Sequence, residues 1–173
     1  FEVAQHRHSP AMNEINGFLN LNKPLGKSSF ALVSLVRSLT GVRRVGHGGT
    51  LDPGAGGVLP LCLGQATRLS DRLLTERKGY SSRVMLGVTT DTYDADGAVV
   101  RQRDPSGVTR EQVEETVGGF LGRIQQVPPM YSALKHKGKR LYELARAGVE
   151  VERKPRTVDI YSLEIKGWEP PYF

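Results

Sequence analysis

The sequence predicts an α+β protein, because it contains both the two-residue period of strands and the capped, apolar-faced segments of helices. Residues 17–23 alternate between apolar and polar side chains, and residues 58–63 form a short apolar run that predicts a buried strand. Two other segments begin with hydroxyl side chains that suit helix N-caps. At 173 residues the chain suits one domain that buries roughly two thirds of its unfolded surface.

The first expected elements are a strand and a helix. Residues 17–23 carry apolar side chains on one face, which predicts a half-buried strand. Ser28 or Ser29 is then expected to cap a helix that ends near Gly41. The three-residue spacing of its apolar side chains predicts a buried face made of Phe30, Val33, Val36 and Leu39.

Residues 79–102 are expected to form two strands joined by a turn. Residues 79–87 alternate in the manner of a strand. Asp96-Gly97 is a frequent hairpin dipeptide, which predicts a turn into a strand at residues 98–102. The acidic residues near this turn do not match the ligand spacing of an EF-hand loop, so no calcium site is predicted.

The last third of the chain is expected to add helices and a strand. Thr109 and Gln112 have the spacing of a capping box, which predicts a helix that closes at Gly122. Its expected buried residues are Val113, Val117, Phe120 and Leu121. A short helix and a strand at residues 156–166 follow. The apolar side chains of that strand move from one face to the other after Ile160, which predicts a bulge.

Composition and charge favour a globular protein with a polyanionic partner. The chain is 38% apolar and 24% charged, with a formal net charge of +6. No apolar run approaches the ~20 residues of a membrane span and no signal peptide pattern is present, so a cytoplasmic protein without a membrane partner is expected. The single cysteine, Cys62, lies in an apolar run and is expected to be a buried, unreactive thiol.

A glycine-rich stretch at residues 45–64 is the strongest functional signal in the residues themselves. Its glycines allow the backbone to approach another molecule closely. It carries one carboxylate, Asp52, and one imidazole, His47, ahead of the apolar run. An acid on a loop mounted on a strand is a common way to present a reactive group. The alternative is that Asp52 only begins a turn before Pro53.

Three segments resemble the TruB family, the transfer RNA pseudouridine synthases that act on the T loop. The first is His-Gly-Gly-Thr-Leu-Asp-Pro at residues 47–53, continued by the apolar run. The second is Lys-Gly-Tyr at residues 78–80 with Thr-Asp-Thr-Tyr-Asp at residues 90–94. The third, at residues 126–148, combines a Pro-Pro dipeptide with a cluster of lysines and arginines interleaved with aromatic side chains, which suits nucleic acid.

The resemblance implies the pseudouridine synthase fold, an α+β fold with a mixed, largely antiparallel sheet flanked by helices. It implies that a uridine in the T stem-loop of tRNA is isomerised to pseudouridine, with no metal and no organic cofactor. The target base is stacked inside an RNA loop, so it is expected to be flipped out of the stack before it reacts. Protein partners are not specified by the resemblance.

The same resemblance implies roles for individual residues. Asp52 is the catalytic residue, either as a nucleophile or as the group that promotes glycosidic cleavage. Tyr80 is implied to stack on the target base, and His47 to occupy the space that this base leaves. Contacts with the RNA backbone are expected at five basic residues: Lys23, Arg43, Arg44, Lys135 and Lys137.

Two alternatives share part of this pattern. A guide-RNA-dependent synthase of the archaeal and eukaryotic type has a similar loop, but the motif at residues 90–94 fits the stand-alone enzyme better. A non-catalytic RNA-binding module accounts for the charge and the aromatic side chains, but not for the acid on the loop.

The chain is expected to divide into a short leader and a catalytic portion. Residues 1–11 are expected to be an N-terminal extension or a vector remnant, because Met12 resembles a natural start. In the TruB family a later segment supplies an arginine that pairs with the catalytic aspartate. Residues 12–173 are therefore expected to be a catalytic domain truncated before its C-terminal part.

Overall fold

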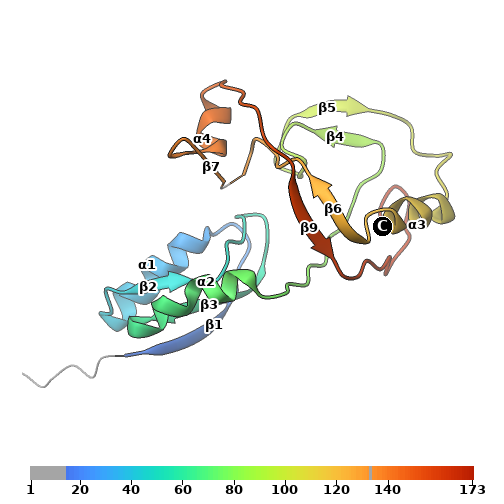
Figure 1. Ribbon diagram of the computed structural model, residues 1–173. Helices are drawn as coiled ribbons and strands as arrows, with labels where there is room; N and C mark the ends of the chain where they lie inside the picture. The colour runs from blue at the N-terminus through green and yellow to red at the C-terminus, as the bar shows by residue number, and fades with distance from the viewer. Residues whose placement is uncertain (1–14, 133) are drawn as a thin grey trace, which may run out of the picture. The chain divides into compact units, whose positions relative to one another are not determined.

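The computed structural model describes residues 15–132 and 134–173, and the chain divides into two compact units, Phe1–Gly79 and Tyr80–Phe173 (Figure 1). The predicted extension at residues 1–11 lies outside the described residues. Among the residues that are described, no helix is long and apolar enough to cross a membrane.

The first unit is built on a three-stranded antiparallel sheet in the order β1-β3-β2. β1 is Gly17–Lys23, β2 is Val45–His47 and β3 is Gly57–Leu63. These bounds confirm the strand predicted at the N-terminus and the strand predicted from the apolar run. A 3₁₀-helix, η1 (Gly64–Leu69), and the helix α2 (Ser70–Thr75) follow β3.

Helix α1, Ser29–Thr40, has both of its predicted ends. Ser28 is the N-cap, and its Oγ accepts a hydrogen bond of 3.1 Å from the Ala31 N–H. Gly41 ends the helix with a φ of 71°, a left-handed conformation that glycine adopts without a Cβ clash. The local cap signals of the sequence are therefore sufficient to place this helix.

The buried face of α1 differs from the prediction. Val33 and Val36 are buried as expected, but Phe30 is 63% exposed and Leu39 is 75% exposed. A strict three-residue spacing drifts by about 60° per step on a helix of 3.6 residues per turn, so four such residues cannot share one stripe. The observed stripe follows the i, i+3, i+4, i+7 pattern: Ser29, Leu32, Val33 and Val36.

The core of the first unit lies between α1 and one face of the sheet. Alternate residues of β3 point into this core, as the two-residue period of a strand requires. Cys62, on the opposite face of β3, is buried and unpaired, and burial raises the pKa of its thiol, in line with the predicted unreactive cysteine. The buried core residues are Leu32, Val33, Val36, Val45, Leu59, Leu61 and Leu63.

The described residues of the second unit form three two-stranded antiparallel sheets. The strand pairs are β4 (Val88–Thr90) with β5 (Val99–Gln102), β6 (Gly122–Gln126) with β9 (Arg156–Ile160), and β7 (Lys135–His136) with β8 (Lys139–Arg140). The β4–β5 pair confirms the predicted turn at Asp96-Gly97 and the strand after it, but the first strand of this hairpin is Val88–Thr90 and not residues 79–87. Its acidic residues bond to their own turn, since Asp91 Oδ1 accepts from the Ala98 N–H at 2.8 Å and Asp94 Oδ1 accepts from the Asp96 N–H at 3.0 Å.

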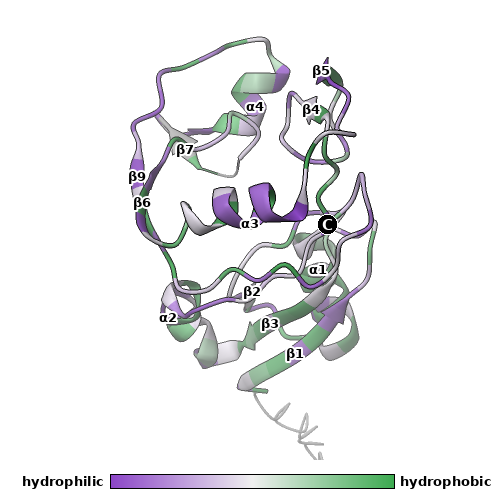
Figure 2. Cartoon of the chain, turned by 90° about the vertical axis from the view of Figure 1, so that its right-hand side faces the viewer, coloured by the Kyte–Doolittle hydropathy of each residue, from purple (hydrophilic) through white to green (hydrophobic). Residues whose placement is uncertain are grey.

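The second unit also contains the helices α3 (Arg110–Gly118) and α4 (Leu141–Arg146). Both arms of the predicted capping box are present in α3. Thr109 Oγ1 accepts from the Gln112 N–H at 3.3 Å, and Gln112 Oε1 accepts from the Thr109 N–H at 2.9 Å. Most of α3 is hydrophilic (Figure 2), and the residue of this helix that is buried is Val113.

The strand predicted at residues 79–87 does not form. Within this segment Met85 makes an isolated antiparallel bridge with Tyr172, supported by backbone hydrogen bonds from Val84 and Leu86 to residues 171–173. A strand requires a continuous partner for its N–H and C=O groups, and here the partner is only a few residues long. The sequence has the side-chain alternation of a strand, but the backbone has no paired strand along most of this segment.

Two element ends in the second unit also differ from the prediction. Helix α3 ends at Gly118, and the following N–H groups donate to carbonyls three residues back, so the chain tightens into 3₁₀ turns and Gly122 begins β6. Beyond the helix end Phe120 and Leu121 are exposed rather than buried. Strand β9 ends at Ile160, so the point at which the apolar side chains change face is the end of the strand and not a bulge.

Candidate active site

The loop that carries Asp52 joins β2 to β3 at one end of the three-stranded sheet. The Gly48 N–H donates to the Pro60 carbonyl at 2.8 Å, which extends the strand pairing just beyond β2. Further on, the Asp52 carbonyl accepts from the Ala55 N–H at 3.0 Å. The backbone of Asp52 thus does begin a turn, as the alternative interpretation expects, but this turn uses none of its side chain.

Residues on both sides of Asp52 are anchored to other parts of the first unit. The Ser29 hydroxyl accepts from the Leu51 N–H and donates to the Leu51 carbonyl, each at 2.9 Å. On the other side, the Pro53 carbonyl accepts from the Gly26 N–H at 2.8 Å. Leu51 also packs against the core, so the backbone around Asp52 is held from two directions.

The Asp52 side chain itself is exposed and forms no hydrogen bond or ion pair with any residue that the structure describes. A turn-bracing aspartate would instead bond to backbone N–H groups of its own turn. An acid without a partner on an anchored backbone is the arrangement expected of a reactive group. The carboxylate is therefore available to a ligand.

Lys23, the last residue of β1, is only 1% exposed. Its ammonium group donates to the carbonyls of Lys27 at 2.6 Å, Pro24 at 3.0 Å and Pro53 at 3.5 Å, which uses all three of its N–H donors. This burial does not fit the predicted contact with an RNA backbone, because a phosphate would have to displace these carbonyls. Lys23 is instead a brace of the Asp52 loop.

His47 is the last residue of β2, where it lies opposite Leu61 and is half-buried. Its Nδ1 is buried and has no hydrogen-bond partner among the described residues. Buried ring nitrogens are normally paired, so this atom retains an unused hydrogen-bonding capacity. His47 and Asp52 therefore lie in one connected segment of the first unit, each with an unpartnered polar group.

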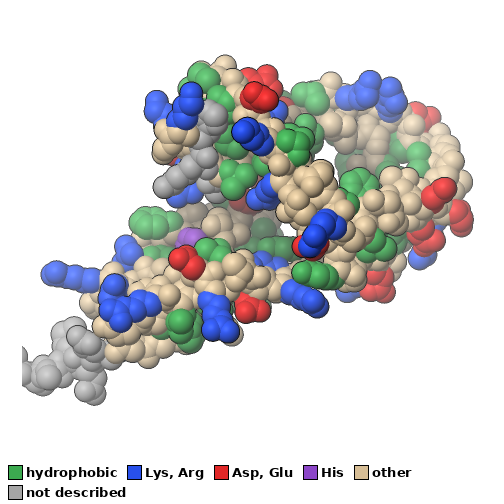
Figure 3. Space-filling model, in the orientation of Figure 1, with side chains coloured by type: hydrophobic (Ala, Val, Ile, Leu, Met, Phe, Trp, Pro, Cys, Tyr) green, Lys and Arg blue, Asp and Glu red, His purple; other side chains and the backbone are tan. Residues whose placement is uncertain are grey.

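Arg43 and Arg44 lie between α1 and β2, and both are exposed. Neither guanidinium pairs with an acidic side chain of the described chain. Figure 3 shows Lys and Arg side chains at several places on the visible surface of each unit. Unpaired surface cations are suited to phosphate contacts, since no local acid competes for them.

The remaining predicted site residues belong to the second unit. Tyr80 is its first residue and is 73% exposed. Lys137 and Gly138 form the tip of the β7–β8 hairpin with φ angles of 48° and 88°, and this tip presents Lys137 to solvent. Lys135 lies in β7, and its side chain falls outside the described part. The roles expected of these residues stay predictions.

A comparison with models of protein families identifies the family of this chain. A family model described as "TruB family pseudouridylate synthase (N terminal domain)" matches residues 37–173, a range that contains the Asp52 loop and Tyr80. The chain belongs to the TruB family. This membership confirms the family that the three sequence motifs indicated.

Relatives and solved structures agree with this TruB assignment. The chain is 50% identical to a tRNA pseudouridine synthase B from Clostridium perfringens over 150 residues, 87% of this chain and 51% of that protein. It thus spans about half the length of the curated relatives it matches. A crystal structure of a Cbf5-Nop10-Gar1 complex is similar, with 26% identity, a TM-score of 0.53, and coverage of 89% of this chain and 37% of that chain.

A structure of an H/ACA RNP bound to a substrate RNA containing 2′-deoxyuridine is also similar to the TruB chain. It shows 27% identity, a TM-score of 0.50, and coverage of 73% of this chain and 36% of that chain. Together with the mixture of helices and antiparallel strands, these similarities confirm the predicted α+β pseudouridine synthase fold.

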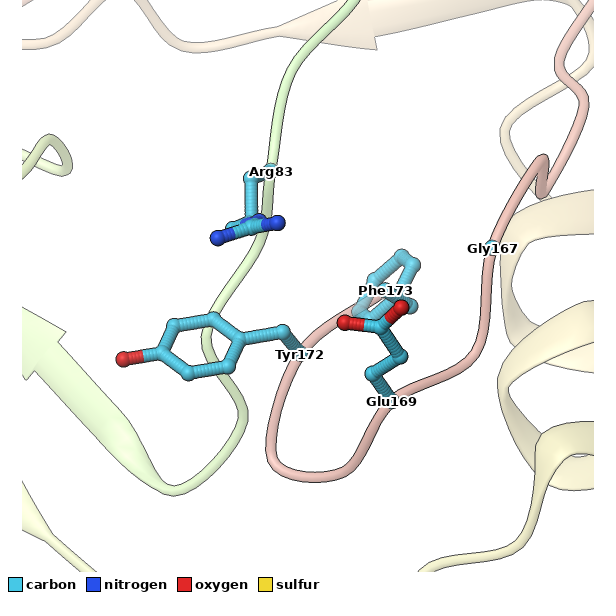
Figure 4. A pocket seen from close by; sticks show the side chains of 5 residues that line it. All are labelled: Arg83, Gly167, Glu169, Tyr172 and Phe173. Atoms are coloured by element: carbon cyan, nitrogen blue, oxygen red, sulfur yellow. The ribbon is translucent and has the colours of Figure 1, made fainter.

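A shallow pocket of about 100 Å³ in the second unit of this TruB chain contains none of the predicted site residues. It is lined by Arg83, Gly167, Glu169, Tyr172 and Phe173 (Figure 4). The Arg83 guanidinium lies 5.5 Å from the centre of the Tyr172 ring, a cation–π contact. Within the described residues, no group of three or more His, Cys, Asp or Glu side chains is placed to hold a metal ion.

The sequence does not identify the residues that anchor the TruB loop. It predicts either Ser28 or Ser29 as the helix cap, whereas both serines have a role: Ser28 caps α1 and Ser29 binds Leu51. Only one residue can be the N-cap, so the second serine, on the buried stripe of a helix, requires another partner. Two adjacent serines at a helix start are the signal from which this anchor could be inferred.

Proposed function

We propose that this chain carries the catalytic portion of an enzyme that converts a T-loop uridine of tRNA to pseudouridine, with Asp52 as the catalytic residue. One observation carries the proposal: an exposed carboxylate without a described partner sits on a backbone anchored on both sides. The 50% identity to a tRNA pseudouridine synthase B supports both the choice of reaction and the choice of tRNA as the substrate.

The reaction is an isomerisation in which atoms and electrons balance within the nucleotide. The bond between C1′ and N1 breaks, a bond between C1′ and C5 forms, C5 loses its proton and N1 gains one. An ionised Asp52 carboxylate suits either route, attack as a nucleophile or promotion of glycosidic cleavage. The balance needs no oxidant or reductant, and the proposal follows the family resemblance in including no organic cofactor and no metal.

The target uridine is proposed to leave its stack in the RNA and to lie against Tyr80. The Tyr80 ring is exposed, and stacking on it would offset part of an unstacking cost of a few kcal/mol. His47, with its unpartnered Nδ1, is proposed to fill the space that the base leaves. Phosphate contacts are proposed for Arg43, Arg44, Lys135 and Lys137, whereas Lys23 is left out because its ammonium is buried.

A guide-RNA-dependent synthase is the second candidate, because one of the similar solved structures is an H/ACA RNP. The identities favour the stand-alone tRNA enzyme, with 50% for tRNA pseudouridine synthase B against 26% and 27% for the two solved structures. Turnover of a bare tRNA transcript, with no guide RNA in the reaction, would support the stand-alone enzyme. Turnover that appears only when guide RNA is added would support the second candidate.

The Asp52→Asn variant of the complete gene product tests the catalytic role. The amide keeps the size of the side chain but removes its charge, so turnover is expected to fall by about 1,000-fold or more while tRNA affinity stays within about twofold. Turnover is measured as tritium released from a tRNA transcript labelled at uridine C5, and affinity by filter binding. Asp71→Asn, the same change at an exposed residue of α2, is the matched control.

Two outcomes would contradict the proposal. Turnover by Asp52→Asn within tenfold of the unmodified protein would remove Asp52 from the chemistry. Tight tRNA binding by the unmodified protein with no tritium release would favour the non-catalytic RNA-binding module.

A further inference from the structure

The Ser29 hydroxyl directly links helix α1 to the Asp52 loop. It forms two hydrogen bonds of 2.9 Å with Leu51, one from the backbone N–H and one to the carbonyl. A hydroxyl is both a donor and an acceptor, so this single group pairs both polar backbone groups of Leu51. Ser29 is 3% exposed, so water has little access to these bonds.

Leu51 depends on this partner because it lies outside the sheet. The pairing between β2 and β3 stops at the hydrogen bond from Gly48 to Pro60. Leu51 nevertheless packs against the core, and buried backbone groups require hydrogen-bond partners. The Ser29 hydroxyl takes the place that a neighbouring strand would otherwise fill.

The same two bonds fix the peptide that leads into Asp52. The Leu51 carbonyl and the Asp52 nitrogen belong to one rigid peptide plane, so holding the carbonyl sets the rotation of that plane. Gly26 holds the carbonyl of Pro53 on the far side. Because the Asp52 carboxylate has no partner of its own among the described residues, its direction depends on these backbone anchors.

We propose that Ser29 is a positioning residue for Asp52, acting through the backbone of Leu51. This inference rests on the proposed role of Asp52 as the catalytic residue. The neighbouring Ser28 provides a contrast, because its side chain accepts from the Ala31 N–H within α1 and forms no hydrogen bond with the described residues of the loop. Substitutions at the two serines can therefore distinguish an effect on helix stability from an effect on the position of the loop.

The test compares Ser29→Ala with Ser28→Ala in the complete gene product. Ser29→Ala is expected to lower kcat by about 10- to 100-fold, because small displacements of a reactive group cost this much, while KM and tRNA affinity stay within about twofold. Ser28→Ala is expected to lower the melting temperature through loss of the cap but to keep kcat wherever the protein is folded. Ser29→Thr retains the hydroxyl and is expected to recover most of kcat.

Hydrogen exchange supplies a readout of the loop itself. The Leu51 amide is expected to exchange faster in Ser29→Ala and at an unchanged rate in Ser28→Ala, since only the first variant removes its acceptor. If Ser29→Ala does not fold, Ser29→Cys replaces it, because a thiol of similar shape is a weak hydrogen-bonding group. Faster Leu51 exchange and an intermediate kcat are expected for that variant.

The outcomes distinguish this inference from the proposed function. Equal losses of kcat in the two alanine variants at equal folded fractions, or an unchanged exchange rate of the Leu51 amide in Ser29→Ala, would overturn the positioning role. A fully active Ser29→Ala beside an inactive Asp52→Asn would contradict the inference alone. An active Asp52→Asn would contradict the proposed function itself.

Discussion

Lys23 and Asp52 are two charged side chains at the same loop with opposite surroundings. The Lys23 ammonium is buried and donates to three carbonyls, whereas the Asp52 carboxylate is exposed and without a described partner. Burial of a charge is unfavourable unless hydrogen bonds replace its lost hydration. The ammonium is therefore used to hold the backbone, and the carboxylate remains available to a substrate.

Replacing Lys23 by Met is expected to lower the free energy of unfolding by about 1.5–3 kcal/mol, the range for hydrogen bonds to a charged group. The substitution leaves the carbonyls of Lys27 and Pro53 without this donor. Lys27→Met, the same change at an exposed side chain nearby, is the control and is expected to stay within about 0.5 kcal/mol. Urea denaturation measures both variants.

A different result would restore the predicted RNA contact of Lys23. If Lys23→Met left stability unchanged but reduced the slope of log affinity against log salt by about one, the side chain would be bound to a phosphate instead.

The connection between β2 and β3 also packs against α2, and this contact explains one of its glycines. A Cβ placed on Gly48 would lie 2.7 Å from both Cβ and Cδ1 of Leu73 in α2, closer than carbon atoms can approach. A Cβ placed on Gly46, in β2, would meet nothing within 4 Å. Packing therefore requires glycine at position 48 but not at position 46.

Substitution by alanine is expected to be tolerated at one of these two glycines and not at the other. Gly48→Ala is expected to lower the free energy of unfolding by about 1–3 kcal/mol, because Leu73 or the loop backbone must move. Gly46→Ala is expected to change it by no more than about 0.5 kcal/mol. Thermal or urea unfolding compares them, and equal effects at the two positions would show that the contact with Leu73 is not what selects glycine.

Positive charge is spread over both units, in keeping with a net charge of +6. Arg43 and Arg44 lie in the first unit, and the hairpin tip with Lys137 lies in the second. A protein that neutralises phosphates releases counterions condensed on the nucleic acid, and this release is less favourable at higher salt, so the attraction weakens. The salt dependence of tRNA binding therefore reports how many of these cations contact phosphates.

Arg43→Gln and Arg44→Gln are each expected to reduce the slope of log affinity against log salt by about one. The control is Arg110→Gln, because the Arg110 guanidinium is paired with Glu114 at 2.7 Å and is not among the proposed phosphate contacts. Filter binding at several salt concentrations gives the slopes. Equal slopes for all three variants would remove Arg43 and Arg44 from the RNA-binding surface.

Local signals in the sequence were enough to place β1, β3, α1 and the capping box of α3. The information for these elements lies within a few residues: side-chain alternation in a strand, or a cap hydrogen bond that spans three residues. The family and the candidate acid also follow from contiguous motifs, because Asp52 lies inside one of them.

The anchors of the acid and the pairing of the strands depend on contacts between distant segments. Ser29 bonds to Leu51, 22 residues away in the sequence, and Lys23 bonds to Pro53, 30 residues away. No local sequence pattern predicts either contact. The alternating segment at residues 79–87 fails to become a strand for the same reason, since pairing requires a partner elsewhere in the chain. Sequence patterns thus identify the reactive group, whereas folding brings together the groups that hold it in place.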